Sequence, residues 1–404
     1  MYIQFWWLLG AVVLGIYMAW NIGANDVANS MASAVGSKAV TFRQAVFIAA
    51  LLNIIGAVFV GSHVTQTVSK GIISSSMIGD PHLIEIGFLA VLLAAGIWVT
   101  FSTWLSMPIS TTHSIVGALI GFGLVVGGRD VVHWRKLWEV VSSWIISPIF
   151  AGLIAFFLFH FIARFILQRK NNVLAARRFS PLFVGGTIFI INLSLFLKTR
   201  LGAYIGNAVI PLSLFVAVVS GVIGYYLAGK ISNRGGTVEL IFKNLQIMTS
   251  CYVALSHGAN DVANAAGPLV SIFYVANFGK IPLKVQVPEW VLVVIGLGIA
   301  LGITTWGYRV MKTVAYKITK ITNVSGFTIQ FSAATSILIS SKLGMPVSTT
   351  HAVIGAVIGA GFAHGIEAVD LNVVKRIIVS WFVTIPAAAL TTIPIYLGLL
   401  HIWR

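Results

Sequence analysis

A polar heptapeptide, Gly-Ala-Asn-Asp-Val-Ala-Asn, occurs twice in otherwise apolar sequence. It occupies residues 23–29 and 258–264, so that Asp26 and Asp261 each follow one asparagine and precede another. A carboxylate inside a long apolar segment is costly to bury, and such residues mark functional sites in membranes. An aspartate that only capped a broken helix would not need to recur with the same flanking asparagines. We therefore expect both aspartates to bind a ligand.

The heptapeptide has the composition of a cation site. In each copy the aspartate and the last asparagine are three residues apart and share one face of a helix. The glycine that opens each copy would let the helix unwind and free backbone carbonyls, which predicts a broken helix around each motif. Carboxylate, amide and carbonyl oxygens together suit a small cation such as Na⁺. The predicted cation ligands are Asp26, Asn29, Asp261 and Asn264.

A second doubled motif, Met-Pro-x-Ser-Thr-Thr-His, occupies residues 107–113 and 345–351. In each copy the proline ends the incoming helix, and the serine is a suitable N-cap for the outgoing helix. Free backbone N–H groups, the positive end of the helix dipole and three hydroxyls then form an anion site. Hydroxyls that merely bonded to their own helix would explain one such residue, but not the whole motif twice. Two helix starts are thus predicted to face one anion.

Neither predicted site contains arginine, so an anion held near two carboxylates would have too little fixed positive charge around it. Mobile cations placed between the aspartates and the anion would supply the missing charge. Each ligand would then raise the affinity for the other, which is a physical reason for co-transport.

The histidines that end the second motif, His113 and His351, could donate to the anion, bond across the hairpin or respond to pH. We expect a structural hydrogen bond rather than direct ligation. No third or fourth ligand stands at a useful spacing, so no metal other than Na⁺ is predicted. A serine and a histidine three apart, without an acidic partner, also lack the geometry of a hydrolase triad, so an enzyme is not expected. The sequence assigns no role to Lys342.

The elements that hold these motifs are membrane spans by composition. Of the 404 residues, 58% are hydrophobic and 9% are charged, whereas a soluble domain is about 25% charged. The mean hydropathy is +0.96, and apolar runs of roughly 18 residues recur. We predict an all-α polytopic membrane protein with about twelve hydrophobic segments. These are expected near 3–35, 42–61, 83–105, 110–127, 137–166, 181–197, 209–229, 242–276, 289–311, 326–343, 347–364 and 373–400.

The doubled motifs divide the chain into two repeats. The heptapeptide lies in the first and eighth segments, which are seven crossings apart and therefore run in opposite directions through the membrane. Each inverted-topology repeat should contain a broken motif helix and a helical hairpin, at 83–127 or 326–364, that is either re-entrant or fully spanning. The predicted division is a first repeat at 1–163, a basic linker with two connecting helices at 164–240, and a second repeat at 241–404.

Basic residues predict the orientation. The formal net charge is +16, and we attribute it to residues that flank the spans rather than to a nucleic-acid partner. If 164–178 is cytoplasmic, sixteen lysines and arginines fall on the inner side and nine on the outer side, with both termini outside. The N-terminus lacks the basic region of a cleaved signal peptide. The lone Cys251 excludes an internal disulfide.

Through these doubled motifs the sequence resembles the inorganic phosphate transporter (PiT) family of sodium- or proton-coupled symporters. The resemblance covers nearly the whole chain, apart from about 164–240. It implies phosphate as substrate, essential aspartates, re-entrant hairpins, a homo-oligomer such as a dimer, and a location in the cell (inner) membrane. Since the family also contains sulfate permeases, phosphate and sulfate both stay open. The implied phosphate ligands are Asn25, Ser110, Thr111, Thr112, Asn260, Ser348, Thr349 and Thr350.

The sequence departs from the family pattern at two glutamates, which are replaced by Asn53 and Gln330. Neutral amides at these positions favour Na⁺ over H⁺ as the coupling ion. We therefore predict sodium-coupled symport of phosphate by alternating access, with no cofactor. A proton-coupled phosphate transporter and a sulfate permease are the alternatives within the family. An anion channel is disfavoured because a channel needs several weak sites along an open path.

Overall fold

The chain folds into a bundle of long helices. The computed structural model describes residues 2–61, 72–73, 78–198, 200–279, 287–342 and 347–403. Within these ranges the backbone is helical apart from short connections and two isolated β-bridges, Ile73 with Val132 and Thr319 with Val369. A helix pairs its own backbone N–H and C=O groups, which is what a segment in a bilayer requires.

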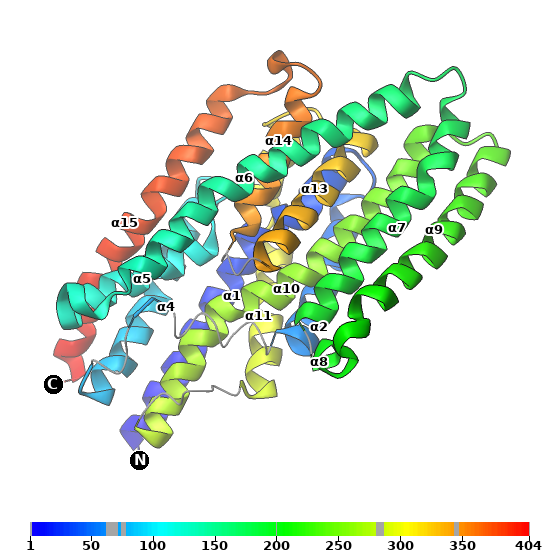
Figure 1. The fold of residues 1–404 in the computed structure, drawn as a ribbon. Helices are drawn as coiled ribbons and strands as arrows, with labels where there is room; N and C mark the ends of the chain where they lie inside the picture. Colours follow the sequence, from blue (N-terminus) through cyan, green and yellow to red (C-terminus); the bar gives the residue numbers. More distant parts are fainter. Residues whose placement is uncertain are drawn as a thin grey trace.

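The main helices, labelled as in Figure 1, are α1 (Tyr2–Gly36), α2 (Phe42–Val60), α4 (Pro81–Trp104), α5 (Thr111–Gly127), α6 (Trp134–Ile162), α7 (Asn172–Lys198), α9 (Val209–Asn233), α10 (Val238–Phe278), α11 (Glu289–Trp306), α13 (Asn323–Lys342), α14 (Thr349–Phe362) and α15 (Leu371–Trp403). Two shorter helices are α8 (Arg200–Ile205) and α12 (Tyr308–Tyr316), and single helical turns lie at Gly128–Val131, Ala163–Leu167, Gly206–Ala208 and Ile366–Ala368.

Each of the twelve predicted segments coincides with one of the main helices, and the all-helical fold class is confirmed. In the described part of the chain, nine helices are long and apolar enough to cross a membrane. One boundary was wrong, because the segment predicted at 289–311 is divided between α11, which ends at Trp306, and α12, which begins at Tyr308.

The predicted break in the motif helices is wrong, because α1 and α10 run without interruption through both heptapeptides. Their glycines instead allow two helices to touch through their backbones. A Cβ on Gly23 would overlap the carbonyl oxygen of Ile299 on α11, and one on Gly302 would overlap the carbonyl oxygen of Trp20 on α1. Small residues at such crossings are a common device in membrane bundles.

The second motif helix makes a matching contact. A Cβ on Gly258 of α10 would overlap the carbonyl oxygen of Asn53 on α2, and one on Gly56 would overlap that of Leu255 on α10. Glycines also line the crossings of α5 with α15 and of α6 with α14. In each of these four pairs, one helix ends at or before Ile162 and the other begins at or after Val238, so the two ends of the sequence are packed into each other.

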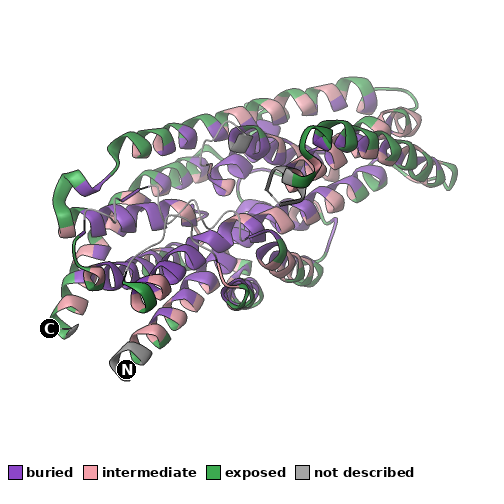
Figure 2. Cartoon of the chain, turned by 60° about the horizontal axis from the view of Figure 1, so that its bottom comes forward, coloured by how far each residue is buried: buried purple, intermediate pink, exposed green. Residues whose placement is uncertain are grey.

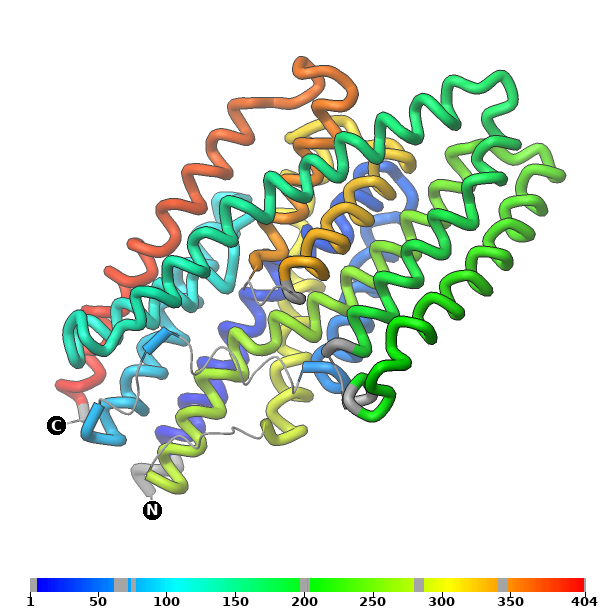
Figure 3. The backbone as a smooth tube through the Cα atoms, in the orientation of Figure 1, coloured from blue at the N-terminus to red at the C-terminus, as the bar shows by residue number. Residues whose placement is uncertain are grey.

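The first residues of α1 and the last of α15 lie at the same end of the bundle, whereas the junction between α6 and α7 lies at the opposite end (Figures 1 and 3). Helices α7 and α9, from the predicted linker, form an edge of the molecule (Figure 1). The outward face of α9 is apolar: Leu214, Phe215 and Val218 are all exposed. Figure 2 shows buried residues concentrated on the central helices, and exposed residues along the outer ones.

The glycine contact between α1 and α11 can be tested by adding one methyl group. Gly302→Ala should lower the thermal unfolding temperature of the detergent-purified protein, because overpacking of this kind costs about 1–3 kcal/mol. Gly10→Ala, on α1, is the matched control, since a Cβ there meets nothing within 4 Å. Equal unfolding temperatures for the two variants would contradict the proposed backbone contact.

Candidate functional site

The carboxylate of Asp26 is the point at which both doubled motifs meet. It is buried, and its Oδ1 accepts hydrogen bonds from Asn29 Nδ2 at 3.1 Å and from Thr350 Oγ1 at 3.1 Å. Its Oδ2 accepts a hydrogen bond from Thr111 Oγ1 at 2.7 Å. Thr111 and Thr350 belong to the first turns of α5 and α14. The two predicted helix starts therefore converge on one acidic side chain of α1.

The two motif asparagines bridge the halves of the chain. Asn29 Nδ2 also donates to Thr350 Oγ1 at 2.9 Å and lies 3.5 Å from Thr349 Oγ1, while Asn264 Nδ2 lies 3.1 Å from Thr112 Oγ1 and 3.3 Å from Thr111 Oγ1. Each asparagine thus reaches the hydroxyls of the other half's hairpin. The hydroxyl of Thr350 is also 3.2 Å from the Ile109 carbonyl oxygen, so its single proton serves two acceptors.

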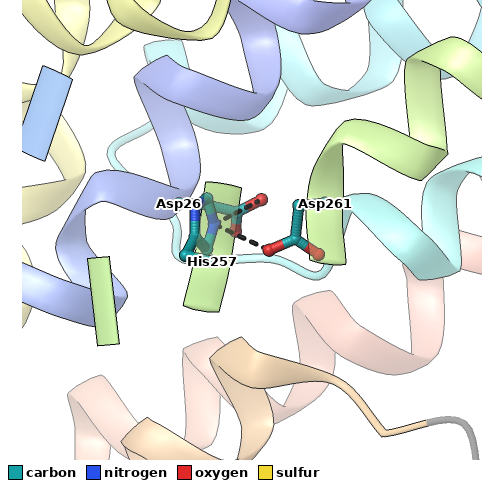
Figure 4. Close-up of side chains that lie close together, drawn as sticks. All are labelled: Asp26, His257 and Asp261. Atoms are coloured by element: carbon teal, nitrogen blue, oxygen red, sulfur yellow. Dashed lines mark ion pairs between the residues drawn. The ribbon is translucent and has the colours of Figure 1, made fainter. Parts of the chain in front are cut away.

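The second aspartate joins the site through a histidine that sequence analysis did not single out. His257 Nε2 lies 2.8 Å from Asp261 Oδ2 and 3.8 Å from Asp26 Oδ2. Figure 4 shows the ring between the two carboxylates, with a dashed line to each. One ligand atom from each of these three buried residues lies within 4.8 Å of the others. His257 Nδ1 lies 2.8 Å from Oδ1 of Asn53 on α2, which fixes the orientation of the ring.

The structure confirms the predicted N-caps. Ser110 Oγ accepts from the His113 backbone N–H and Ser348 Oγ from the His351 backbone N–H, both at 3.3 Å. Each serine thus satisfies one of the backbone donors that a helix start leaves unpaired. The hydroxyls of the following threonines therefore stay available to other partners. Pro346, which was predicted to end the incoming helix, lies outside the described residues.

Asn25 holds the turn between α4 and α5. Its Nδ2 donates to Thr103 Oγ1 at 2.9 Å and to the Met107 carbonyl oxygen at 3.1 Å, and its Oδ1 accepts from the Ile109 N–H at 3.1 Å. These bonds engage both the amide nitrogen and the amide oxygen of Asn25. In this conformation Asn25 therefore holds the segment that leads into α5 in place. Asn260, its counterpart on α10, is half-buried and directly precedes Asp261.

Gln330 on α13 braces the first motif helix. Its Nε2 lies 3.2 Å from the Asn29 carbonyl oxygen, 3.0 Å from the Ser30 carbonyl oxygen and 2.9 Å from Ser33 Oγ. A neutral amide can donate here, and an ionised glutamate could not. An ionised glutamate in place of Gln330 would therefore leave these three oxygens without their donor.

The two motif histidines form an aromatic cluster. The ring centroids of His113 and His351 are 4.4 Å apart. The Trp144 ring packs against His113 with a centroid distance of 3.5 Å, and the Trp381 ring packs against His351 with a centroid distance of 3.7 Å. His351 Nδ1 also lies 3.1 Å from the Trp144 carbonyl oxygen. For His351 this contact agrees with the expected structural hydrogen bond. The side chain of Lys342 lies outside the described residues.

His257 was detectable in the sequence. When the two heptapeptides are aligned, His257 precedes Gly258, whereas Ile22 precedes Gly23. A titratable side chain therefore breaks the repeat next to a predicted cation ligand. The difference between the two copies, rather than the motif that they share, therefore indicates His257 as a candidate site residue.

This geometry defines a class of protein. The many apolar helices make it a multi-pass membrane protein, and they enclose a polar, acidic site around Asp26 and Asp261. Residues 22–392 match the phosphate transporter family. The chain belongs to that family, whose members are transporters and not enzymes.

Individual relatives span nearly the whole chain. A protein of Pyrococcus abyssi, provisionally named a phosphate permease, is 48% identical over 394 residues, which cover 96% of this chain and 97% of the relative. The chloroplastic inorganic phosphate transporter 2-1 of Arabidopsis thaliana is 40% identical over 408 residues, covering 94% of this chain and 70% of the relative. A solved structure titled as the sodium-dependent phosphate transporter has a TM-score of 0.90 at 43% identity, covering 98% of this chain and 99% of that one.

The bond between Asn53 and His257 can be tested by a double-mutant cycle. Asn53→Ala and His257→Ala should lower the thermal unfolding temperature by amounts that do not add in the double variant, because residues in one hydrogen bond couple by about 0.5–3 kcal/mol. Asn277→Ala, whose amide donates to the Phe273 carbonyl oxygen of its own helix, is the matched partner for the control cycle. Additive effects in both cycles would mean that Asn53 does not orient His257.

Proposed function

We propose that this protein is a sodium-coupled symporter of inorganic phosphate. The observation that carries the proposal is the convergence of hydroxyls from two helix starts, Thr111 of α5 and Thr350 of α14, on the Asp26 carboxylate. Oxygen ligands for a small cation and hydroxyl donors for an anion thereby occupy one buried volume. The solved structure titled as a sodium-dependent phosphate transporter supports both the substrate and the coupling ion.

The hydrogen bonds suggest how the two ligands depend on each other. The hydroxyl proton of Thr111 is directed at Asp26, 2.7 Å away. A phosphate that accepted this proton would leave a buried carboxylate oxygen without a partner, which costs several kcal/mol. A Na⁺ bound to that oxygen removes the penalty and at the same time attracts the phosphate. Asp26, Asn29, Asp261 and Asn264 are our proposed cation ligands.

The proposed phosphate ligands surround the same point. The first turns of α5 and α14 offer backbone N–H groups and the positive ends of two helix dipoles, which favour an anion. We assign hydroxyl contacts to Ser110, Thr111, Thr112, Ser348, Thr349 and Thr350, and amide contacts to Asn25 and Asn260. Asn25, Ser110 and Ser348 can contact phosphate in this way only if they give up the hydrogen bonds that they make in the present structure.

We further propose that the two halves are inverted repeats, with re-entrant hairpins at α4–α5 and α13–α14, and that transport proceeds by alternating access. The repeated sequence motifs and the matching glycine crossings of α1 with α11 and of α2 with α10 support this symmetry. The facing ends of α13 and α14 lie in the interior of the bundle (Figure 1). A cell (inner) membrane location with both termini outside, and a homo-oligomer, complete the proposal.

Proton coupling is the second candidate, and His257 is the observation that favours it. In the assigned orientation, Asn53 Oδ1 accepts the proton on His257 Nδ1, so the 2.8 Å contact between Nε2 and Asp261 needs one further proton, on the ring or on the carboxyl. A positive charge or a mobile proton at this position could stand in for one cation. Sulfate remains the alternative anion, although the family and its relatives carry phosphate in their names.

Uptake of labelled phosphate into proteoliposomes tests the function. A Na⁺ gradient without a pH gradient should drive uptake, a pH gradient without Na⁺ should not, and a tenfold excess of sulfate should leave the rate nearly unchanged. Uptake driven equally well by the pH gradient alone would favour the proton-coupled alternative. Competition by sulfate as strong as that by unlabelled phosphate would reassign the anion.

The aspartates can be tested by removing charge while keeping shape. Asp26→Asn and Asp261→Asn should each lower phosphate uptake by about tenfold or more and weaken its dependence on Na⁺ concentration, because the cation loses a charged oxygen ligand. Asp130→Asn, in an exposed turn, is the control and should transport normally. Unaltered sodium-driven uptake by both site variants would overturn the cation assignment.

The hydroxyls can be tested at saturating Na⁺. Thr112→Val and Thr350→Val should each raise the KM for phosphate about tenfold, since a hydrogen bond to a charged group contributes about 1.5–3 kcal/mol. Thr304→Val, which loses only a bond to the Leu301 carbonyl oxygen on the exposed side of α11, should keep the original KM. An unchanged KM in both site variants would remove the hydroxyls from the phosphate site.

A further inference from the structure

A groove outside the transport site runs between α4 and the beginning of α15, two helices that lie side by side (Figure 1). Its volume is about 510 Å³, within the usual range of ligand pockets. It lies on the outer surface of the bundle, since Phe101 of α4, Leu105 directly after α4, and Val379 and Val383 of α15 are all exposed along it.

Two adjacent cations, Lys375 and Arg376, form one end of the groove. Both are exposed, and in the described part of the chain neither charged group makes an ion pair or a hydrogen bond. The groove lining contains no acidic residue. Asp370, the nearest acid in sequence, uses Oδ1 to accept the backbone N–H groups of Asn372 and Val373 at the start of α15. The mouth of the groove therefore carries two positive charges that the protein leaves uncompensated.

The remaining lining of the groove is apolar. Exposure of apolar side chains to water is unfavourable, whereas contact with an acyl chain is favourable. The apolar wall of the groove consists of Phe101, Leu105, Val379 and Val383. Helix α15 has 33 residues, whereas about 20 are enough to cross a bilayer, so its first turns with Lys375 and Arg376 can stand at the membrane surface. The exposed Trp104 at the end of α4 fits the aromatic belt found at that depth.

We propose that this groove binds an anionic phospholipid, with its phosphate group at Lys375 and Arg376 and an acyl chain along the apolar wall. Ser102 and Ser380, which also line the groove, supply neutral hydrogen-bonding groups. Basic pockets between membrane helices are suited to anionic head groups. A soluble phosphate ion would match the cations but not the exposed apolar wall, and a zwitterionic lipid would bring its own positive charge to the two cations.

The groove shares residues with the support of the transport site. Met107 lines it, and the Met107 carbonyl oxygen accepts the hydrogen bond from Asn25 Nδ2. Trp98 also lines it and joins the two helices, because its Nε1 donates to Thr384 Oγ1 at 3.1 Å. The bound lipid would therefore steady the α4–α5 turn against α15. The binding itself does not depend on the proposed transport function.

Native mass spectrometry of the detergent-purified full chain tests the proposal. With added phosphatidylglycerol, the wild type should retain at least one lipid, and phosphatidylcholine at the same concentration should be retained about tenfold less. The double substitution Lys375→Gln with Arg376→Gln should weaken phosphatidylglycerol binding by about tenfold. The double substitution Arg169→Gln with Lys170→Gln removes an equally charged, exposed pair at the other basic junction and should leave binding unchanged.

Three results would overturn the lipid site. They are equal phosphatidylglycerol binding by the Lys375/Arg376 double variant, equal retention of the zwitterionic lipid by the wild type, and displacement of the bound lipid by millimolar inorganic phosphate. The last result would assign the groove to a soluble anion. Monodisperse elution and an unchanged unfolding temperature show that each variant is folded, and no transport measurement enters the comparison.

Discussion

The site depends on the need to compensate a buried carboxylate. Asp26 receives hydroxyl protons from two helix starts that are more than 200 residues apart in sequence. Since an unpaired buried charge is destabilising by several kcal/mol, these bonds draw the tips of both hairpins to one point. The same bonds are the ones that an anion would have to take over. In the proposed mechanism, structural stability and ligand exchange thus depend on the same few protons.

Amide side chains organise this acidic centre without adding charge. Asn25 holds the turn that leads into α5, Gln330 donates to the backbone of α1, and Asn53 directs the ring of His257. An amide can donate and accept at once, so it can connect helices whose free groups differ. With amides in these supporting positions, the formal negative charge of the centre stays confined to Asp26 and Asp261.

Much of this arrangement could be predicted from the sequence. Long apolar runs located the helices, and the proline-serine pattern located the caps at Ser110 and Ser348, because both signals are local. The role of Gly23 could not be predicted, since unwinding a helix and admitting a neighbouring backbone both call for a residue without a side chain. Only the position of Ile299 on α11 distinguishes the two. The functions of individual ligands remain predictions, because hydrogen bonds among the candidates do not show which of them a phosphate or a sodium ion would take.

The glycine crossings have a consequence for the origin of the fold. Helices of each half find their closest partners in the other half, so a single half has no complete interior of its own. If the halves are the inverted repeats proposed above and arose from one shorter gene, its product had to assemble as a pair of identical chains inserted in opposite directions in the lipid. Fusion of the two genes would then have linked the two orientations covalently, so that assembly no longer depended on two separate chains meeting. After fusion each copy could diverge, and the pairing of His257 with Ile22 at matching positions is an example.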